Sequence, residues 1–324
     1  MAIYQHLDTF AGKAVADFQH EHQGEDAASI YGTAEKTLAG EPSSDAGDHA
    51  WRIGSWYEGP EFADVLQKFL DAPGAAAVTH LVVGYWGADY DEGAADPVRL
   101  LVDAADRLPS LRALFLGDIV MEQAEISWIE QSDITPLFGA FPLLEHLEVR
   151  GGLDLALRPF TSTVLKTLRF ESGGLPRAVV RALGESDLPA LEHLDLWLGV
   201  GNYGGDATVA DLAPILGGGR LPSLRHLGLE DSEIQDELAA AVAGAPIVAR
   251  LESLSLAMGV LTDRGAESLL SGQPLTHLTS LDLHHHYLTE PMADRVRAAL
   301  PGVAVDLSEG HDAQDRWPYV AVSE

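Results

Sequence analysis

One short pattern recurs along this chain and limits what the chain can fold into. It consists of an apolar residue, two variable residues, an apolar residue, one variable residue and an apolar residue, as in VTHLVV, LRALFL, LEHLEV, LKTLRF, LEHLDL, LRHLGL, LESLSL and LTSLDL. WRIGSW is expected to open the series and GVAVDL to close it. The central apolar residues of the copies are 21 to 33 residues apart: Leu81, Leu114, Leu147, Leu168, Leu194, Leu227, Leu254, Leu281 and Val305. Such periods are typical of repeat proteins, in which each unit buries its apolar face against its neighbours.

Each copy is expected to form a short strand, because residues two apart lie on the same face of a strand. The segments between copies mostly have a helical pattern, as in PVRLLVDAADRL, PRAVVRAL, TVADLAPIL, DELAAAVAG, TDRGAESLL and EPMADRVRAAL. Thr262 and Thr289 are plausible N-caps, and Pro97, Pro176 and Pro291 suit a first helical turn. Repeated strand, turn and helix predict an α/β fold with a parallel sheet and helices on one side of it.

The copies resemble leucine-rich repeats of the ribonuclease-inhibitor-like type, most closely in LSLAMGVLTDRGAESLL and LDLHHHYLTEPMADRV. The chain also resembles an uncharacterised bacterial family of such solenoids. The resemblance implies a horseshoe of about ten repeats over residues 50–308, with a concave parallel sheet and a mostly helical convex side. Leucine-rich repeats usually place Asn or Cys in the turn after the strand, whereas this chain has mostly Gly there. The tolerance of glycine for unusual backbone dihedrals is expected to shape most of these turns.

Both ends of a solenoid need a cover, because a terminal repeat has no neighbour on one side. Residues 1–49 are expected to form an N-terminal cap, with a hairpin around Gly12 followed by a linker that ends near His49. The apolar start of the concave face, at Val82 and Phe115, is expected to lie under this segment, with a partner protein as the alternative cover. Residues 309–324 are expected to form a C-terminal tail that covers the final strand with Trp317, Tyr319, Val320 and Val322.

Composition excludes several classes of function. The 324 residues include 50 Asp and Glu but only 20 Lys and Arg, so the formal net charge is −30. A strongly negative protein repels phosphate groups, so neither nucleic acid nor an anionic membrane is an expected partner. The chain has no cysteine, which excludes disulfides and thiolate nucleophiles. No secretory signal or membrane-spanning stretch is evident, and we expect a cytoplasmic location.

Motifs for catalysis are equally scarce. The sequence has no GxSxG, no HExxH and no Walker A motif, and its glycine-rich stretches GVGNYGG and LGGGR are interpreted as repeat loops. We therefore expect a non-enzymatic binding or scaffold protein without a cofactor, whose acidic concave sheet recognises a basic segment of a protein or peptide partner.

The residues between the strand leucines should face the concave side. At the centre of the sheet, Glu148, Arg169 and Asp195 should lie side by side on three strands, with Arg150 and Glu171 next to them. Neighbouring strands are about 4.8 Å apart, so opposite charges would meet at nearest-neighbour distance. These side chains can pair with one another or contact a ligand, and the sequence leaves both possibilities open.

A recess is expected beside these charges. Trp197 should project from the sheet, and small residues follow it on the next strands, so that Trp197, Glu230, Asp282 and His284 bound a hollow. An exposed aromatic ring near carboxylates suits a cationic side chain, although Trp197 can instead pack against the loop that follows it. The residues expected to bind the partner are Arg150, Arg169, Glu171, Asp195, Trp197, Glu230, Asp282 and His284.

Three consecutive histidines follow one strand. His286 occupies the turn position where related repeats have Asn, so its ring should bond backbone groups of the turn, whereas His285 is expected to be solvated. His284 should face the concave side with Asp282, because the two are two residues apart. Together with Asp306 on the next strand they could hold a divalent ion. A metal-dependent hydrolase with its site at these three residues is therefore the alternative function.

Overall fold

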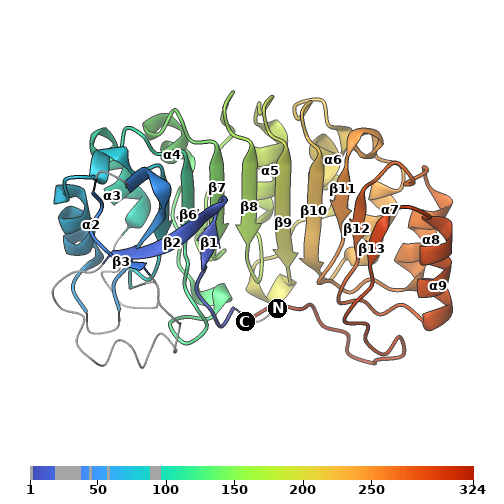
Figure 1. Cartoon of the computed structure of the whole chain (residues 1–324). Coiled ribbons are helices and arrows are strands. Elements are labelled where there is room, and N and C mark those ends of the chain that lie inside the picture. The colour runs from blue at the N-terminus through green and yellow to red at the C-terminus, as the bar shows by residue number, and fades with distance from the viewer. Residues whose placement is uncertain (1–2, 19–37, 44–45, 57–58, 88–95) are drawn as a thin grey trace.

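The computed structural model describes residues 3–18, 38–43, 46–56, 59–87 and 96–324. All strands of the described residues belong to one open sheet, with the order β1-β2-β4-β5-β6-β7-β8-β9-β10-β11-β12-β13 and with β3 paired to β2 (Figure 1). The strands are β1 (Thr9–Phe10), β2 (Lys13–Phe18), β3 (Leu38–Gly40), β4 (Ala50–Ile53), β5 (His80–Val83), β6 (Ala113–Leu116), β7 (His146–Arg150), β8 (Thr167–Glu171), β9 (His193–Gly199), β10 (His226–Ser232), β11 (Ser253–Ser255), β12 (Ser280–Asp282) and β13 (Ala304–Asp306).

Helices connect most of the parallel strands and lie on the outer side of the curved sheet in Figure 1. They are α2 (Phe62–Asp71), α3 (Pro97–Asp103), α4 (Thr135–Ala140), α5 (Arg177–Glu185), α6 (Val209–Gly217), α7 (Gln235–Val242), α8 (Asp263–Ser271) and α9 (Glu290–Ala299). The six helical segments expected from the sequence are all present, and Thr262 and Thr289 cap α8 and α9 with their side chains. Within the described ranges, no helix is both long and apolar enough to cross a lipid bilayer.

The recurrent leucines form the core. They pair in register from strand to strand, for example Leu114 with Leu147 and Leu194 with Leu227, and they are almost fully buried. This confirms the expected α/β fold with a mostly parallel, open sheet, an arrangement that fits a repeat solenoid. The face of the sheet opposite the helices is called the open face below.

The N-terminal hairpin covers one end of the open face. β1 and β2 are antiparallel around Gly12, whose φ of 82° lies in the left-handed region that glycine adopts without strain. Phe10 packs with Val82 and Phe115 in a small separate apolar cluster, so the chain's own N-terminal segment covers these residues as expected. Much of the linker predicted up to His49 lies outside the described residues, which omit 19–37 and 44–45.

The C-terminal tail follows a different path from the expected one. It does not cover β13, whose three residues are half-buried or exposed, and Trp317 is 81% exposed. Instead the tail turns back toward earlier repeats, and its backbone bonds Met258, Asp231 and Ser127 in turn. Val322 is buried along this route, because the loops that follow the strands offer the tail an apolar surface.

The consecutive histidines 284–286 lie in different environments, and two of them bond backbone groups. His286 bonds turn backbone, since its Nδ1 accepts from the Leu288 N–H at 3.1 Å, which confirms the expected role. His285 is buried and not solvated as expected. Its φ of 54° turns the side chain out of the strand alternation, and the ring bonds the carbonyl of Tyr319 and the ring of His311.

His286 supplies a first prediction. Replacing it with Ala leaves the buried Leu288 N–H without its acceptor, and we expect a loss of about 1–3 kcal/mol in the free energy of unfolding. His286→Asn keeps an acceptor close to the backbone and should cost less than half as much. Urea unfolding of both variants measures the difference, and equal losses would contradict the role given to the ring.

Candidate functional site

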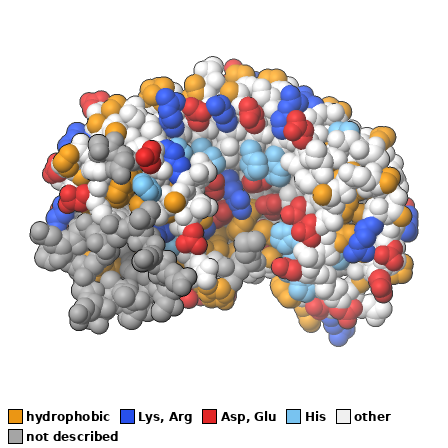
Figure 2. Space-filling view, in the orientation of Figure 1, with side chains coloured by type: hydrophobic (Ala, Val, Ile, Leu, Met, Phe, Trp, Pro, Cys, Tyr) orange, Lys and Arg blue, Asp and Glu red, His pale blue; other side chains and the backbone are white. Residues whose placement is uncertain are grey.

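A groove of about 920 Å³ runs along the open face from β7 to β13. The N-terminal residues Ile3, Gln5 and Leu7 line one side of it. Figure 2 shows acidic, basic and histidine side chains gathered on this hollowed face. The groove brings together all eight residues predicted to contact a partner: Arg150, Arg169, Glu171, Asp195, Trp197, Glu230, Asp282 and His284.

The central charges are paired with one another and are largely buried. Nε of Arg150 lies 2.7 Å from Glu171, and Nε of Arg169 lies 3.0 Å from the other oxygen of the same carboxylate. The guanidinium of Arg150 also lies over the ring of Phe115, 5.1 Å from its centre. The sequence left open whether these side chains pair with one another or contact a ligand, and in the structure they pair with one another. They form the floor of the groove.

Trp197 is a wall of the groove and does not project from the sheet as expected. Only 3% of the residue is exposed, because the Arg169 guanidinium lies over the ring, 5.4 Å from its centre. The indole N–H donates to Glu230 at 2.8 Å, and the Ser255 hydroxyl donates to the other oxygen of that carboxylate. Burial, followed by the nearby charge of Asp195, raises the pKa of Glu230.

The β12–β13 end of the groove is open and acidic. Asp282 and Asp306 are register partners on neighbouring strands, and the Asp282 side chain is 37% exposed. Nδ1 of His284 lies 2.9 Å from Asp282, and this hydrogen bond raises the pKa of the imidazole. The Ser308 side chain and N–H bond Asp306 and lower the pKa of its carboxyl group. One ligand atom from each of Asp282, His284 and Asp306 lies within 4.8 Å of the other two, as the alternative function requires.

A second group of this kind lies at the centre of the groove and was not predicted as a metal-ligand set. Asp195 is buried between two histidines and is bonded by Nε2 of His193 at 2.6 Å and by Nε2 of His226 at 2.8 Å. Burial opposes the charged form of Asp195, but these hydrogen bonds outweigh it and lower the pKa of the carboxyl group. The sequence signal was present, because HLDL and HLGL place His193 and His226 at the same position of consecutive strands.

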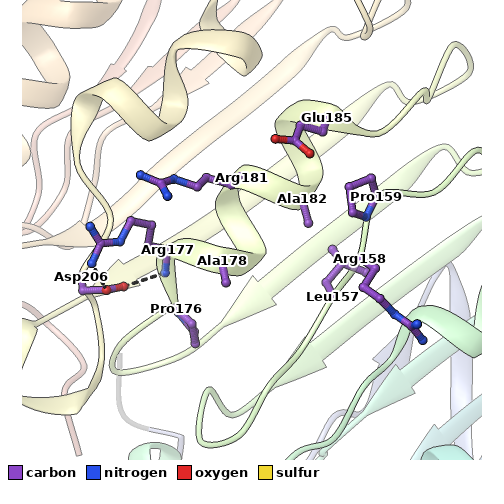
Figure 3. A pocket seen from close by; sticks show the side chains of 10 residues that line it. All are labelled: Leu157, Arg158, Pro159, Pro176, Arg177, Ala178, Arg181, Ala182, Glu185 and Asp206. Carbon is purple, nitrogen blue, oxygen red and sulfur yellow. Dashed lines mark hydrogen bonds and ion pairs between the residues drawn. The ribbon is translucent and has the colours of Figure 1, made fainter.

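A smaller hollow of about 390 Å³ lies on the helical side, between α5 and the segment before β8 (Figure 3). Four of its five charged lining residues are paired with other protein groups. Arg177 donates to Asp206 through both its N–H and its side chain, Arg181 bonds Asp211 at 2.6 Å, and Arg158 bonds Asp133 at 2.7 Å. Figure 3 shows Arg158 pointing away from the helix. The open-face groove is therefore the stronger candidate for a functional site.

Comparison with known proteins places the chain in a family. No protein-family model and no curated protein matches it. A crystal structure of a protein from Bacteroides fragilis, solved as a structural genomics target, is similar with a TM-score of 0.73 and 32% sequence identity. The match covers 80% of this chain and 72% of that one. At this identity and coverage, the chain belongs to the same family as that Bacteroides fragilis protein.

Proposed function

We propose that this chain is a leucine-rich-repeat horseshoe that acts as a binding protein, and that its groove holds a basic segment of a protein or peptide partner. The observation that carries the proposal is the pair of carboxylates at the β12–β13 end, Asp282 and Asp306, which stand on neighbouring strands and remain accessible. Two carboxylates about one strand spacing apart suit a lysine ammonium or the fork of an arginine.

The charge of the whole groove favours the same kind of ligand. Six carboxylates line it but only two guanidinium groups do: Glu148, Glu171, Asp195, Glu230, Asp282 and Asp306 against Arg150 and Arg169. Both arginines pair with Glu171. The remaining negative charge of the groove is therefore available to attract a cationic ligand. The net charge of −30 over the chain adds long-range attraction for a basic segment.

The residues beside the two carboxylates in the groove are small. Ser253, Ser280 and Ala304 stand in the row beside them, and these small side chains leave room for a long basic side chain to lie across the strands. Serine hydroxyls can also accept hydrogen bonds from an ammonium or guanidinium group. Trp197 and Glu230 enclose the other side of the recess and act as its wall, because the ring is already covered by Arg169.

The test measures binding of a short fluorescent lysine–glycine peptide by anisotropy. Asp282→Asn combined with Asp306→Asn should weaken binding at least about tenfold, since two charge-assisted hydrogen bonds are lost. Glu267→Gln combined with Asp294→Asn, on the exposed surfaces of α8 and α9, removes the same charge and should change binding less than about twofold.

Equal weakening by both double variants would mean that only the overall charge attracts the peptide, and it would overturn the proposed site. The second candidate function is metal-dependent hydrolysis at Asp282, His284 and Asp306, favoured by the 4.8 Å spacing of their ligand atoms. A chelator distinguishes the two functions. If the carboxylates bind the basic side chain of the peptide directly, removal of divalent ions leaves peptide binding unchanged.

A further inference from the structure

We propose that His193, Asp195 and His226 form a binding site for a divalent transition-metal ion, with two imidazole nitrogens and one carboxylate as ligands. The three residues offer ligand atoms that all lie within 4.8 Å of one another. Two histidines and one carboxylate are a ligand set that suits Zn²⁺, Fe²⁺ or Co²⁺, for which imidazole is a preferred donor. This set is called the histidine–aspartate cluster below.

The sheet itself builds the cluster. His193 and Asp195 are two residues apart on β9, so both side chains emerge on the open face. His226 is the register partner of His193 on β10, and the two rings stack with their centres 4.0 Å apart and their planes at 10°. Nε2 of both rings is directed at one buried carboxylate. The ligand atoms are therefore positioned by rigid strands and not by a loop, which favours a defined geometry.

The neighbouring strand β10 leaves space for the carboxylate of Asp195. Gly228 is the register partner of Asp195, and a Cβ at this position would overlap Oδ1 of Asp195. The absence of a side chain there lets the carboxylate lie between the two rings. The same Cβ would also lie 3.3 Å from Cδ of Glu230, so a second buried carboxyl group is close to the cluster.

The hydrogen bond at the second ring nitrogen of His226 is of the kind that orients histidine ligands in metal sites. Nδ1 of this ring lies 2.7 Å from Oγ of Ser253 on β11. When Nε2 binds a metal, the ring proton resides on Nδ1, and the serine oxygen is placed to accept it and to fix the ring. When the ion binds Nε2, a doubly protonated ring releases its Nε2 proton to the solvent, whereas a neutral ring moves its single proton from Nε2 to Nδ1.

The cluster also leaves room for further ligands. The side chains of His193 and His226 are 39% and 20% exposed and both line the groove. Three protein ligands leave one or more coordination positions for water or for a group on a bound partner. One charge opposes the ion, since Nη1 of Arg169 lies 4.0 Å from Asp195, but Nε of that guanidinium lies closer to Glu171, at 3.0 Å.

The cluster is a better site for a transition metal than the group at Asp282, His284 and Asp306. That group has a single imidazole and two carboxylates, a set that favours harder ions, and its carboxylates are more exposed. Matched variants of the two groups therefore locate the ion. His226→Gln keeps an amide that can donate to Asp195 but removes the imidazole, and His284→Gln makes the same change at the other group.

The experiment titrates metal-free protein, prepared without a histidine tag, with Co²⁺ and follows the visible absorption of the bound ion, with Zn²⁺ as competitor. Wild type should bind one equivalent. His226→Gln and His193→Gln should each weaken Co²⁺ binding by about 100-fold, because losing a ligand should cost at least as much as losing a group that hydrogen-bonds a ligand. His284→Gln should change Co²⁺ binding less than about twofold. Peptide binding is a separate measurement, so its failure leaves this test intact.

Thermal unfolding supplies a second readout that does not depend on the colour of the bound ion. Zn²⁺ should raise the Tm of wild type and of His284→Gln but not that of His226→Gln, because only a folded site binds the ion. The proposal is overturned if wild type binds no Co²⁺, if binding survives both His193→Gln and His226→Gln, or if only His284→Gln abolishes it. The last outcome would place the ion at Asp282, His284 and Asp306 instead.

Discussion

Replacing Asp118 with Ala is expected to lower the free energy of unfolding by about 3–5 kcal/mol, because it removes a buried carboxylate that Arg52 and Arg150 share and leaves part of their buried charge uncompensated. Asp118 follows β6 and is fully buried. Its carboxylate lies 2.9 Å from Nη1 of Arg52 and 3.7 Å from Nη1 of Arg150, and both oxygens accept from the Leu7 N–H at 3.3 Å. One carboxylate thus joins the N-terminal segment, β4 and the floor of the groove.

The loss should depend on pH in a defined direction. Burial alone would raise the pKa of Asp118, but the hydrogen bond and charge of His6, followed by the charges of Arg52 and Arg150, lower it to about 2. A carboxyl group with a lower pKa in the folded state stabilises the fold above its unfolded pKa of about 3.9. The stabilisation is therefore complete at neutral pH and is lost as the pH falls from about 4 toward 2.

Urea unfolding of wild type and Asp118→Ala between about pH 3 and pH 8 tests both statements. The difference should be constant above about pH 5 and should shrink below about pH 4. Asp294→Ala is the matched control, since Asp294 pairs with Arg297 on the surface of α9 and its side chain is 71% exposed. Such pairs contribute about 0–1 kcal/mol, so a similar loss in the two variants would contradict the role of Asp118.

The strand pattern was sufficient to predict the α/β fold with its mostly parallel sheet and eight of the side chains that line the groove. Leucines at fixed spacing set the register of parallel strands, and that register fixes which intervening side chains stand next to each other. Asp282 therefore meets Asp306, and Arg150 meets Glu171, as expected from the sequence. Side chains alternate between the two faces of a strand, so the face on which a residue lies can be predicted from its neighbours in the sequence.

Exposure could not be predicted in the same way, because it depends on side chains that reach across several strands. Trp197 was expected to project, but Arg169 from β8 covers its ring and Glu230 from β10 bonds its indole. His285 was expected to be solvated, but a backbone φ of 54° directs it toward the returning C-terminal tail. That path depends on contacts with loops of distant repeats, such as the bond from the Val322 N–H to Asp231, and no local pattern encodes it.

Phe10→Ala is expected to cost about 3–5 kcal/mol in the free energy of unfolding, because a buried aromatic ring is removed from a packed cluster. Phe10 is 3% exposed, and its ring lies edge-on to Phe115 and His146, with ring centres 5.8 and 5.1 Å apart. Tyr4→Ala, at a residue that is 55% exposed in the same segment, should cost less than about 0.5 kcal/mol. Urea unfolding measures both, and binding of a hydrophobic dye should rise only in Phe10→Ala, since the apolar surface of Val82 and Phe115 loses its cover. Equal losses in the two variants, or no rise in dye binding, would mean that the hairpin does not seal this end of the open face, and that a partner would have to cover it instead.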